Sequence, residues 1–156
     1  MKILIFGTMV LAALSLTACG PDLDPDEQMD TLMDQRWLLE SVGSTSSYDL
    51  DTLRPNHISF TSNIPNMAQA FAGCNTIAGR YELDGMNLVF DRVAVTKQGC
   101  EDMVQEELLI EALENTNNYR IINDRLEFRN DGRKLAVFLK DTGEFFLPMP
   151  YDVRAR

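Results

Sequence analysis

The sequence predicts a mainly β protein of the α+β class: a bent antiparallel sheet or cracked β-barrel of about eight strands with one amphipathic helix. Short runs rich in β-branched and aromatic residues are broken about every eight to twelve residues by Gly, Asn, Asp and Pro, a spacing typical of antiparallel β domains. One later segment instead has helical periodicity. Hydrophobic residues make up 45% of the 156 residues, enough for the packed core of one domain.

The chain begins with the pattern of a secretion signal over residues 1–18. Lys2 precedes an apolar run, residues 3–16, and small residues follow it. A permanent membrane span needs about 20 apolar helical residues, so this run is short for a transmembrane helix. We therefore expect export and removal of residues 1–18.

The four residues Leu16-Thr17-Ala18-Cys19 resemble the lipobox of bacterial lipoproteins. The resemblance implies that the Cys19 thiol receives a diacylglyceride and that the new amine is acylated, which would anchor the protein durably to a membrane. Gly20, rather than Asp, follows the cysteine, which favours the outer membrane, facing the periplasm, over the inner membrane. The alternative is an ordinary signal peptide that happens to end at a cysteine.

Residues 19–34 are predicted to form an acidic flexible tether, because prolines and aspartates dominate the segment. A calcium loop is the alternative reading of these aspartates. The glycine and the terminal glutamate that an EF-hand requires are missing, so we expect no metal here.

The domain itself is predicted over residues 35–147, followed by a C-terminal tail over residues 148–156. Turn residues that tolerate positive φ separate three pairs of apolar runs and predict hairpins at Asp84-Gly85, Asn123-Asp124 and Asn130-Asp131-Gly132. The expected strands are 36–42, 57–61, 68–73, 79–83, 87–95 (with a break at Asp91 as a variant), 119–122, 125–129 and 135–140.

The amphipathic helix is expected over residues 101–113. Val104, Leu108 and Ala112 recur every four residues and predict its buried face. The opposite face is expected to be solvated, with docking of a basic partner as the alternative; it carries Glu106, Glu107, Glu111 and Glu114.

The charge balance excludes two classes of partner. The chain has 24 acidic residues against 14 Lys and Arg, and cleavage would remove one of the lysines. Nucleic acids and anionic lipid surfaces attract clustered basic residues, which this chain lacks. We therefore expect no nucleic acid partner and membrane contact only through the lipid anchor.

If lipid occupies Cys19, the remaining cysteines, Cys74 and Cys100, form an even pair in an exported protein. Oxidising compartments favour pairing them, so a Cys74–Cys100 disulfide is predicted. Two buried free thiols are the alternative.

No catalytic set is recognisable, and we expect a protein that is not an enzyme and needs no cofactor. His57 is the one histidine, at the start of a predicted strand, which leaves too few ligands for a zinc site. The sequence has no nucleophile elbow, phosphate-binding glycine loop or zincin motif. Paired carboxylates could support a hydrolase, but so many acids give no pointer to any pair.

Three motifs carry a family resemblance: Gly73-Cys74-Asn75, Gly79-Arg80-Tyr81 and Thr96-Lys97-Gln98-Gly99-Cys100 before the acidic helix. Together they resemble the META domain, the HslJ-like family of envelope proteins. The resemblance implies bent antiparallel strands with one helix. Members have been linked to heat-shock response and novobiocin tolerance, with no established reaction.

The motif residues have a structural and a functional interpretation. In the first, Gly73 permits a bulge or close approach, Asn75 adopts a left-handed turn and Cys100 fixes the helix start. In the second, Asn75, Arg80 and Thr96 form a binding surface.

Two functions follow as hypotheses. The first is an anchored envelope lipoprotein that binds or stabilises another envelope protein, in stress or drug tolerance. The alternative is a periplasmic carrier or sensor with a small apolar ligand inside the barrel.

Overall fold

A computed structural model describes residues 24–46 and 54–143. Their elements are α1 (Pro25–Leu32), β1 (Gln35–Val42), β2 (Thr45–Ser46), β3 (His57–Phe60), β4 (Met67–Phe71), β5 (Thr76–Asp84), β6 (Asn87–Val95), α2 (Val104–Asn115), β7 (Asn118–Ile122), β8 (Arg125–Asn130) and β9 (Arg133–Lys140). The predicted strands are confirmed, each end within three residues.

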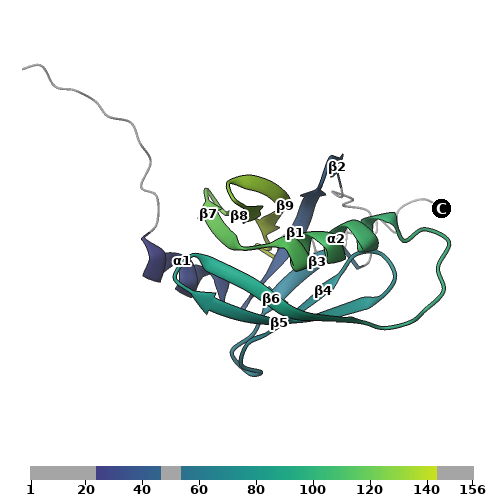
Figure 1. Cartoon of the computed structure of the whole chain (residues 1–156), viewed down its shortest axis with the longest axis horizontal. Helices are drawn as coiled ribbons and strands as arrows, with labels where there is room; N and C mark the ends of the chain where they lie inside the picture. The colour runs from purple at the N-terminus through teal and green to yellow at the C-terminus, as the bar shows by residue number, and fades with distance from the viewer. Residues whose placement is uncertain (1–23, 47–53, 144–156) are drawn as a thin grey trace, which may run out of the picture.

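The strands form one curled antiparallel sheet in the order β6-β5-β4-β3-β1-β9-β8-β7, with β2 paired to β1 (Figure 1). The predicted fold class, a bent sheet or cracked barrel with an amphipathic helix, is confirmed. Two elements were not predicted, the short strand β2 and the helix α1.

The barrel closes only partly, along the seam between its two edge strands. Two backbone hydrogen bonds join the start of β6 to β7, from Leu88 N–H to the Asn117 carbonyl (3.3 Å) and from Tyr119 N–H to the Met86 carbonyl (3.0 Å). Beyond these bonds, α2 packs on β6 and buries Leu109 in the core. The crack is therefore covered by a helix.

Aromatic side chains fill the interior of the sheet. Ring centroids lie 5.3 Å apart in Phe60–Tyr81, 5.8 Å in Phe90–Phe128 and 5.0 Å in Phe128–Phe138. Separations of this size are ordinary contacts between packed rings. The space that the carrier hypothesis assigns to a ligand is thus occupied by the protein's own side chains.

All three predicted hairpins form, because their turn residues adopt the positive φ that tight two-residue turns need. Asn123 and Asp124 have φ of 49° and 59°, and Gly85 has φ of 56°. Strand β6 is continuous, but its pairing with β5 shifts at Asp91, the position considered for a break: Arg80 pairs with Arg92 and Tyr81 with Phe90, so Asp91 is left out of the register.

The predicted flexible tether over residues 19–34 is wrong in its second part, because Pro25–Leu32 form the helix α1. Asp24 caps it, accepting hydrogen bonds from Glu27 N–H (2.9 Å) and Asp26 N–H (3.0 Å). The acidic residues that suggested a tether instead begin a helix, where their negative charge interacts favourably with the helix dipole. The buried Leu32 carbonyl accepts a bond from Trp37 Nε1 (3.2 Å).

The buried face of α2 also differs from the predicted one. Leu109, Ala112 and Leu113 are buried, whereas Val104, expected inside, is 58% exposed. Glu106, expected on the solvated face, is 1% exposed. The helix is rotated so that one glutamate enters the protein interior.

Candidate functional site

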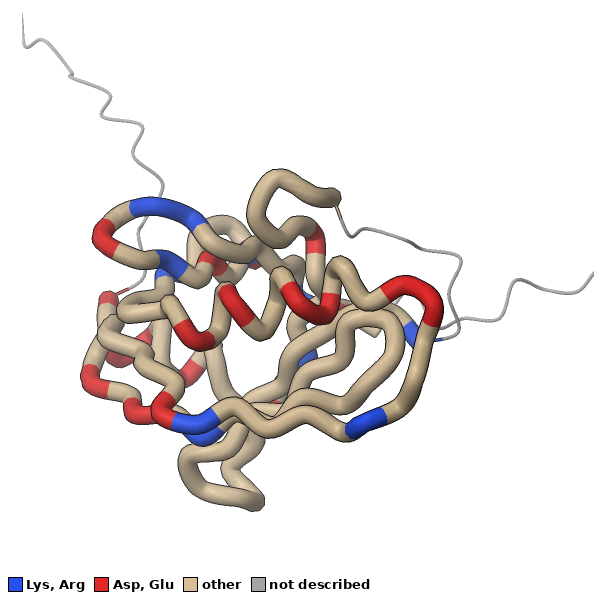
Figure 2. Tube along the Cα trace, turned by 45° about the vertical axis from the view of Figure 1, so that its right-hand side comes forward, with Lys and Arg blue, Asp and Glu red and all other residues tan. Residues whose placement is uncertain are grey.

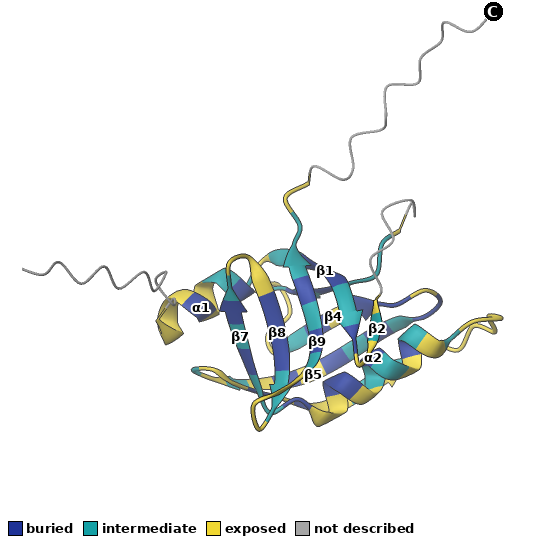
Figure 3. Cartoon of the chain, turned by 90° about the horizontal axis from the view of Figure 1, so that it is seen from above, coloured by how far each residue is buried: buried dark blue, intermediate teal, exposed yellow. Residues whose placement is uncertain are grey.

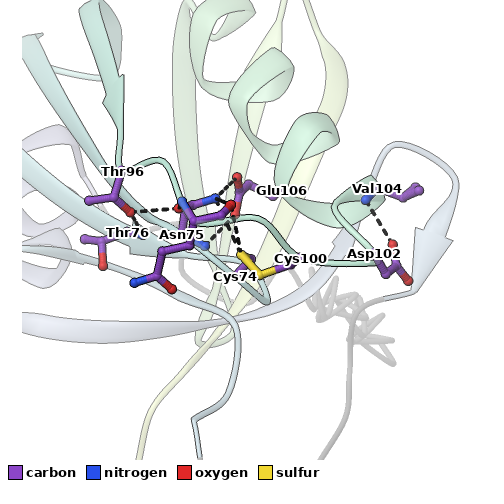
Figure 4. Close-up of a disulfide and its surroundings, with 9 residues drawn as sticks. Cys74, Asn75, Thr76, Thr96, Cys100, Asp102, Val104 and Glu106 are labelled. Carbon is purple, nitrogen blue, oxygen red and sulfur yellow. Dashed lines mark hydrogen bonds between the residues drawn. A yellow bond between two sulfur atoms is a disulfide. The ribbon is translucent and has the colours of Figure 1, made fainter.

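The disulfide predicted from the cysteine count is present and joins Cys74 to Cys100, with Cα atoms 6.2 Å apart (Figure 4). Cys74 lies in the turn between β4 and β5, and Cys100 lies in the segment that leads from β6 to α2. The bond ties the start of α2 to the sheet. We call residues 73–76, 96–100 and Glu106 the junction.

Asn75 is the centre of the junction and is 1% exposed. Its Oδ1 accepts hydrogen bonds from Thr96 Oγ1 (2.9 Å) and from Gln98 N–H (2.8 Å). Its Nδ2 donates to Glu106 Oε1 (2.9 Å) and to the Gln98 carbonyl (3.4 Å). The amide thus uses its donors and its acceptor to join the turn after β4 to two other segments, residues 96–98 and α2.

Glu106 holds the other side of the same network (Figure 4). Its two carboxylate oxygens accept hydrogen bonds from the Asn75 side chain and, at 2.6 Å, from the Asn75 backbone N–H. Bonds to an ionised acceptor are stronger than neutral ones, and a buried carboxylate without donors is costly. Sequence analysis missed this residue among several similar acids on the helix.

Thr96 completes the junction from β6. Its hydroxyl accepts a bond from Thr76 N–H (3.1 Å) while donating to Asn75. The Thr96 N–H donates to the Thr76 carbonyl (3.1 Å). The threonine therefore continues the β5–β6 pairing past the strand end.

The predicted binding surface is only partly assembled. Asn75 and Thr96 lie together, but Asn75 is buried and its φ is not positive, so the left-handed turn expected of it is wrong. Gly73, with φ of 109°, takes the unusual backbone conformation instead. Arg80 lies further along β5 and is exposed, with its Nε 3.7 Å from Asp91 Oδ2.

The neighbouring motif glycine has a packing role. A Cβ at Gly79 would lie 2.8 Å from Cδ1 of Phe90, a ring of the core. Real Cβ atoms do not approach so closely, so Gly79 is required for the ring to pack across β5. The Gly73, Asn75 and Gly79 positions of the motifs are thus explained by structure.

A groove of about 430 Å³ lies beside the junction, between the end of β6 and the first turns of α2. Val95, Met103 and Ile110 provide apolar lining, and the exposed residues Lys97 and Glu107 also line the groove. Because the disulfide and the Asn75–Glu106 bonds hold both walls, the groove is preformed. A preformed, largely apolar groove with a few polar groups is typical of a binding site.

Acidic residues also lie before and along α2, and one of them, Glu107, lines the groove. Exposed acids precede α2 and follow its outer face, as Figure 2 shows in red along the helix: Glu101, Asp102, Glu107, Glu111 and Glu114. Asp102 Oδ1 accepts a bond from Val104 N–H (3.1 Å), which places the acid at the positive end of the helix.

His57 lies at the start of β3, half-buried, and its Nδ1 is 2.8 Å from the Pro55 carbonyl oxygen. The carbonyl can only accept, so Nδ1 carries the proton. Burial lowers the pKa of the imidazole, which keeps the ring neutral at pH 7. This hydrogen bond pairs the ring with a carbonyl and not with a nucleophile.

Two features that would indicate other functions, a metal site and a membrane-spanning helix, are not found in the part of the chain described. Over residues 24–46 and 54–143, no three His, Cys, Asp or Glu side chains gather as a metal site. No helix among these residues is long and apolar enough to cross a membrane. Cys19, the predicted lipidation site, lies outside the described residues.

The fold and the junction define a small antiparallel barrel domain whose single seam is sealed by a disulfide-tied helix. The chain belongs to the META domain family, whose model matches residues 30–142. The match begins within α1, which the prediction had placed outside the domain.

Two solved structures share the fold. A protein from Burkholderia xenovorans, solved by NMR, superposes with a TM-score of 0.62 at 21% identity, covering 85% of this chain and 99% of its own. A second protein solved by NMR gives 0.56 at 23% identity, covering 75% and 95%. No curated protein matches the sequence. Neither the family description nor these structures indicate a catalytic activity.

Proposed function

We propose that this protein is a lipid-anchored, non-catalytic envelope protein that binds and stabilises another envelope protein through the groove beside the junction. The observation that carries the proposal is the preformed groove. Its walls are fixed by a covalent bond and by a buried hydrogen-bond network, so a partner would bind without first ordering the site.

The lipobox at Cys19 supports the anchor, and Gly20 supports the outer membrane, facing the periplasm, as its location. A role in stress or drug tolerance rests on the functions linked to the family. The alternative, a carrier of a small apolar ligand, gains no support from an interior occupied by aromatic rings.

Photo-crosslinking in intact cells tests the groove. A crosslinking amino acid at Lys97, an exposed residue that lines the groove, should give a discrete protein adduct, whereas one at Arg80, exposed but outside the groove, should not. The Gly99→Trp variant should abolish the Lys97 adduct, because Gly99 lines the groove and a Cβ there meets no atom within 4 Å. Equal adducts from both positions would contradict the proposal.

Mass spectrometry of protein extracted gently from its own membranes tests the anchor separately. A chain that begins at Cys19 and carries acyl chains supports it, and an unmodified Cys19 thiol contradicts it.

A further inference from the structure

The helix α1 lies at one end of the barrel and the junction lies at the other (Figures 1 and 3). Gln28 of α1 donates from Nε2 to Met86 Sδ (3.5 Å), in the turn that follows β5. The other end of β5 begins at Thr76, in the junction. Strand β5 therefore connects the two ends.

The length of β5 sets the distance between these ends. It has nine residues. At roughly 3.3 Å per residue, nine residues span about 30 Å. The groove is thus separated from α1 by most of the length of the domain.

The chain between the predicted lipid site and α1 is much shorter. Asp24, the N-cap of α1, follows Cys19 by five residues. Five residues reach at most about 18 Å, even when the chain is fully extended. α1 is fixed to the body by the buried Leu32 and by Gln28 Oε1, which accepts a bond from Ile121 N–H (2.8 Å).

We propose that the α1 end of the barrel is the face held against the membrane surface, so that the junction and its groove point away from the lipid. If the junction faced the bilayer, α1 would stand about 30 Å from it, beyond the reach of about 18 Å. This orientation rests on the lipid anchor of the proposed function.

The chemistry of α1 fits contact with headgroups without insertion. Met29 and Met86, both at this end, are 37% and 40% exposed and offer small apolar contacts. Asp26, Glu27 and Asp30 are exposed on the same helix, and carboxylates are too costly to enter hydrocarbon. The lipid surface is therefore touched and not penetrated.

The test uses the lipidated protein in phosphatidylcholine vesicles that contain a nitroxide-headgroup lipid. A thiol-reactive dye is placed by Asp30→Cys on α1 or, in a matched variant, by Val104→Cys at the start of α2. Both positions are exposed, and the native cysteines that remain are paired. We expect strong loss of fluorescence at position 30 and little loss at position 104.

A longer tether supplies the control. Inserting about 30 Gly and Ser residues after Gly20 gives a relaxed span of about 30 Å, which should bring the quenching at the two positions closer together. If the protein floats with the vesicles but the dye is quenched equally at both positions, or more at position 104, the proposed orientation is wrong while the lipid anchor is supported. A chain that does not float contradicts the anchor and, with it, the orientation.

Discussion

The two ends of the barrel are closed by different chemistry. At the α1 end, a helix is attached by apolar burial of Leu32 and by neutral hydrogen bonds, chiefly those of Gln28. At the junction end, a disulfide and a buried carboxylate tie α2 to the sheet. Neutral bonds are lost at modest cost, whereas an uncompensated buried charge is expensive. The difference indicates that the junction end is built to hold a fixed shape.

The largest effect is expected from Asn75→Asp, a nearly isosteric change at the junction. It replaces the Nδ2 donor by an oxygen 2.9 Å from Glu106 Oε1, so two carboxylates would face each other in the interior. We expect the free energy of unfolding to fall by about 3–5 kcal/mol, measured by chemical denaturation. Asn63→Asp, at an exposed position, is the control and should change it by less than about 0.5 kcal/mol.

Replacing both Cys74 and Cys100 by Ser should rank second. The bond closes a loop with a sequence separation of 26 residues. The chain-entropy estimate for such a loop is about 3–4 kcal/mol, which we take as the upper bound of the loss. The thermal midpoint of the variant should match that of the reduced native protein. An unchanged midpoint would mean that the disulfide does not stabilise the junction.

Gln28→Ala tests the opposite end and should have a smaller effect. It leaves the Ile121 N–H buried without its acceptor, which we expect to cost about 1–3 kcal/mol. Amide exchange at Ile121 should accelerate, while exchange at Gln98, in the junction, should not. Met29→Ala, on the exposed side of the same helix, is the matched control. Equal acceleration at both amides would show that the ends do not open independently.

The smallest effect is expected from a change at Glu127 of β8, which pairs with Arg129 and Lys134. Burial alone would raise the pKa of Glu127, but the hydrogen bonds and charges of Lys134 and Arg129 outweigh it and lower that pKa from its ordinary value. Because Lys134 is well exposed, we expect Glu127→Gln to cost only about 1 kcal/mol at pH 7.

The ion pairs of Glu127 also predict how the free energy of unfolding changes at acidic pH. A lowered folded-state pKa stabilises the protein above the unfolded pKa, and the contribution is lost as the pH falls through the folded value. The difference in unfolding free energy between the native protein and Glu127→Gln should therefore shrink below about pH 4.5. A constant difference down to the acid transition would contradict the assigned ion pairs.

Sequence reasoning predicted what depends on neighbours along the chain. The hairpin at Asn123-Asp124 followed from two residues that tolerate positive φ, and both adopt it. The disulfide followed from counting cysteines in a chain that we expected to be exported. These features need no knowledge of distant contacts.

What sequence reasoning missed depends on partners far apart in the chain. Asn75 bonds to Glu106 across 31 residues, and Gln28 bonds to Ile121 across 93. No local pattern marks one glutamate among four on a helix as the buried one. The rotation of α2 was missed because apolar residues at Leu108, Leu109 and Ile110 fit more than one helical face. The acids before α1 were read by composition, although their spacing is that of a capping box.

Strand β1 has a consequence for how the chain folds. In the sheet it is the strand bonded both to β3 and to β9, so it joins a local meander, β3 to β6, to a second one, β7 to β9. Each meander can form from contacts between neighbours, but β1 meets β9 only after nearly the whole described chain has emerged. Long-range pairing is slow because the intervening loop must close first. Assembly of the two halves should therefore be the late step, and substitutions in β1 should slow folding more than those in either meander.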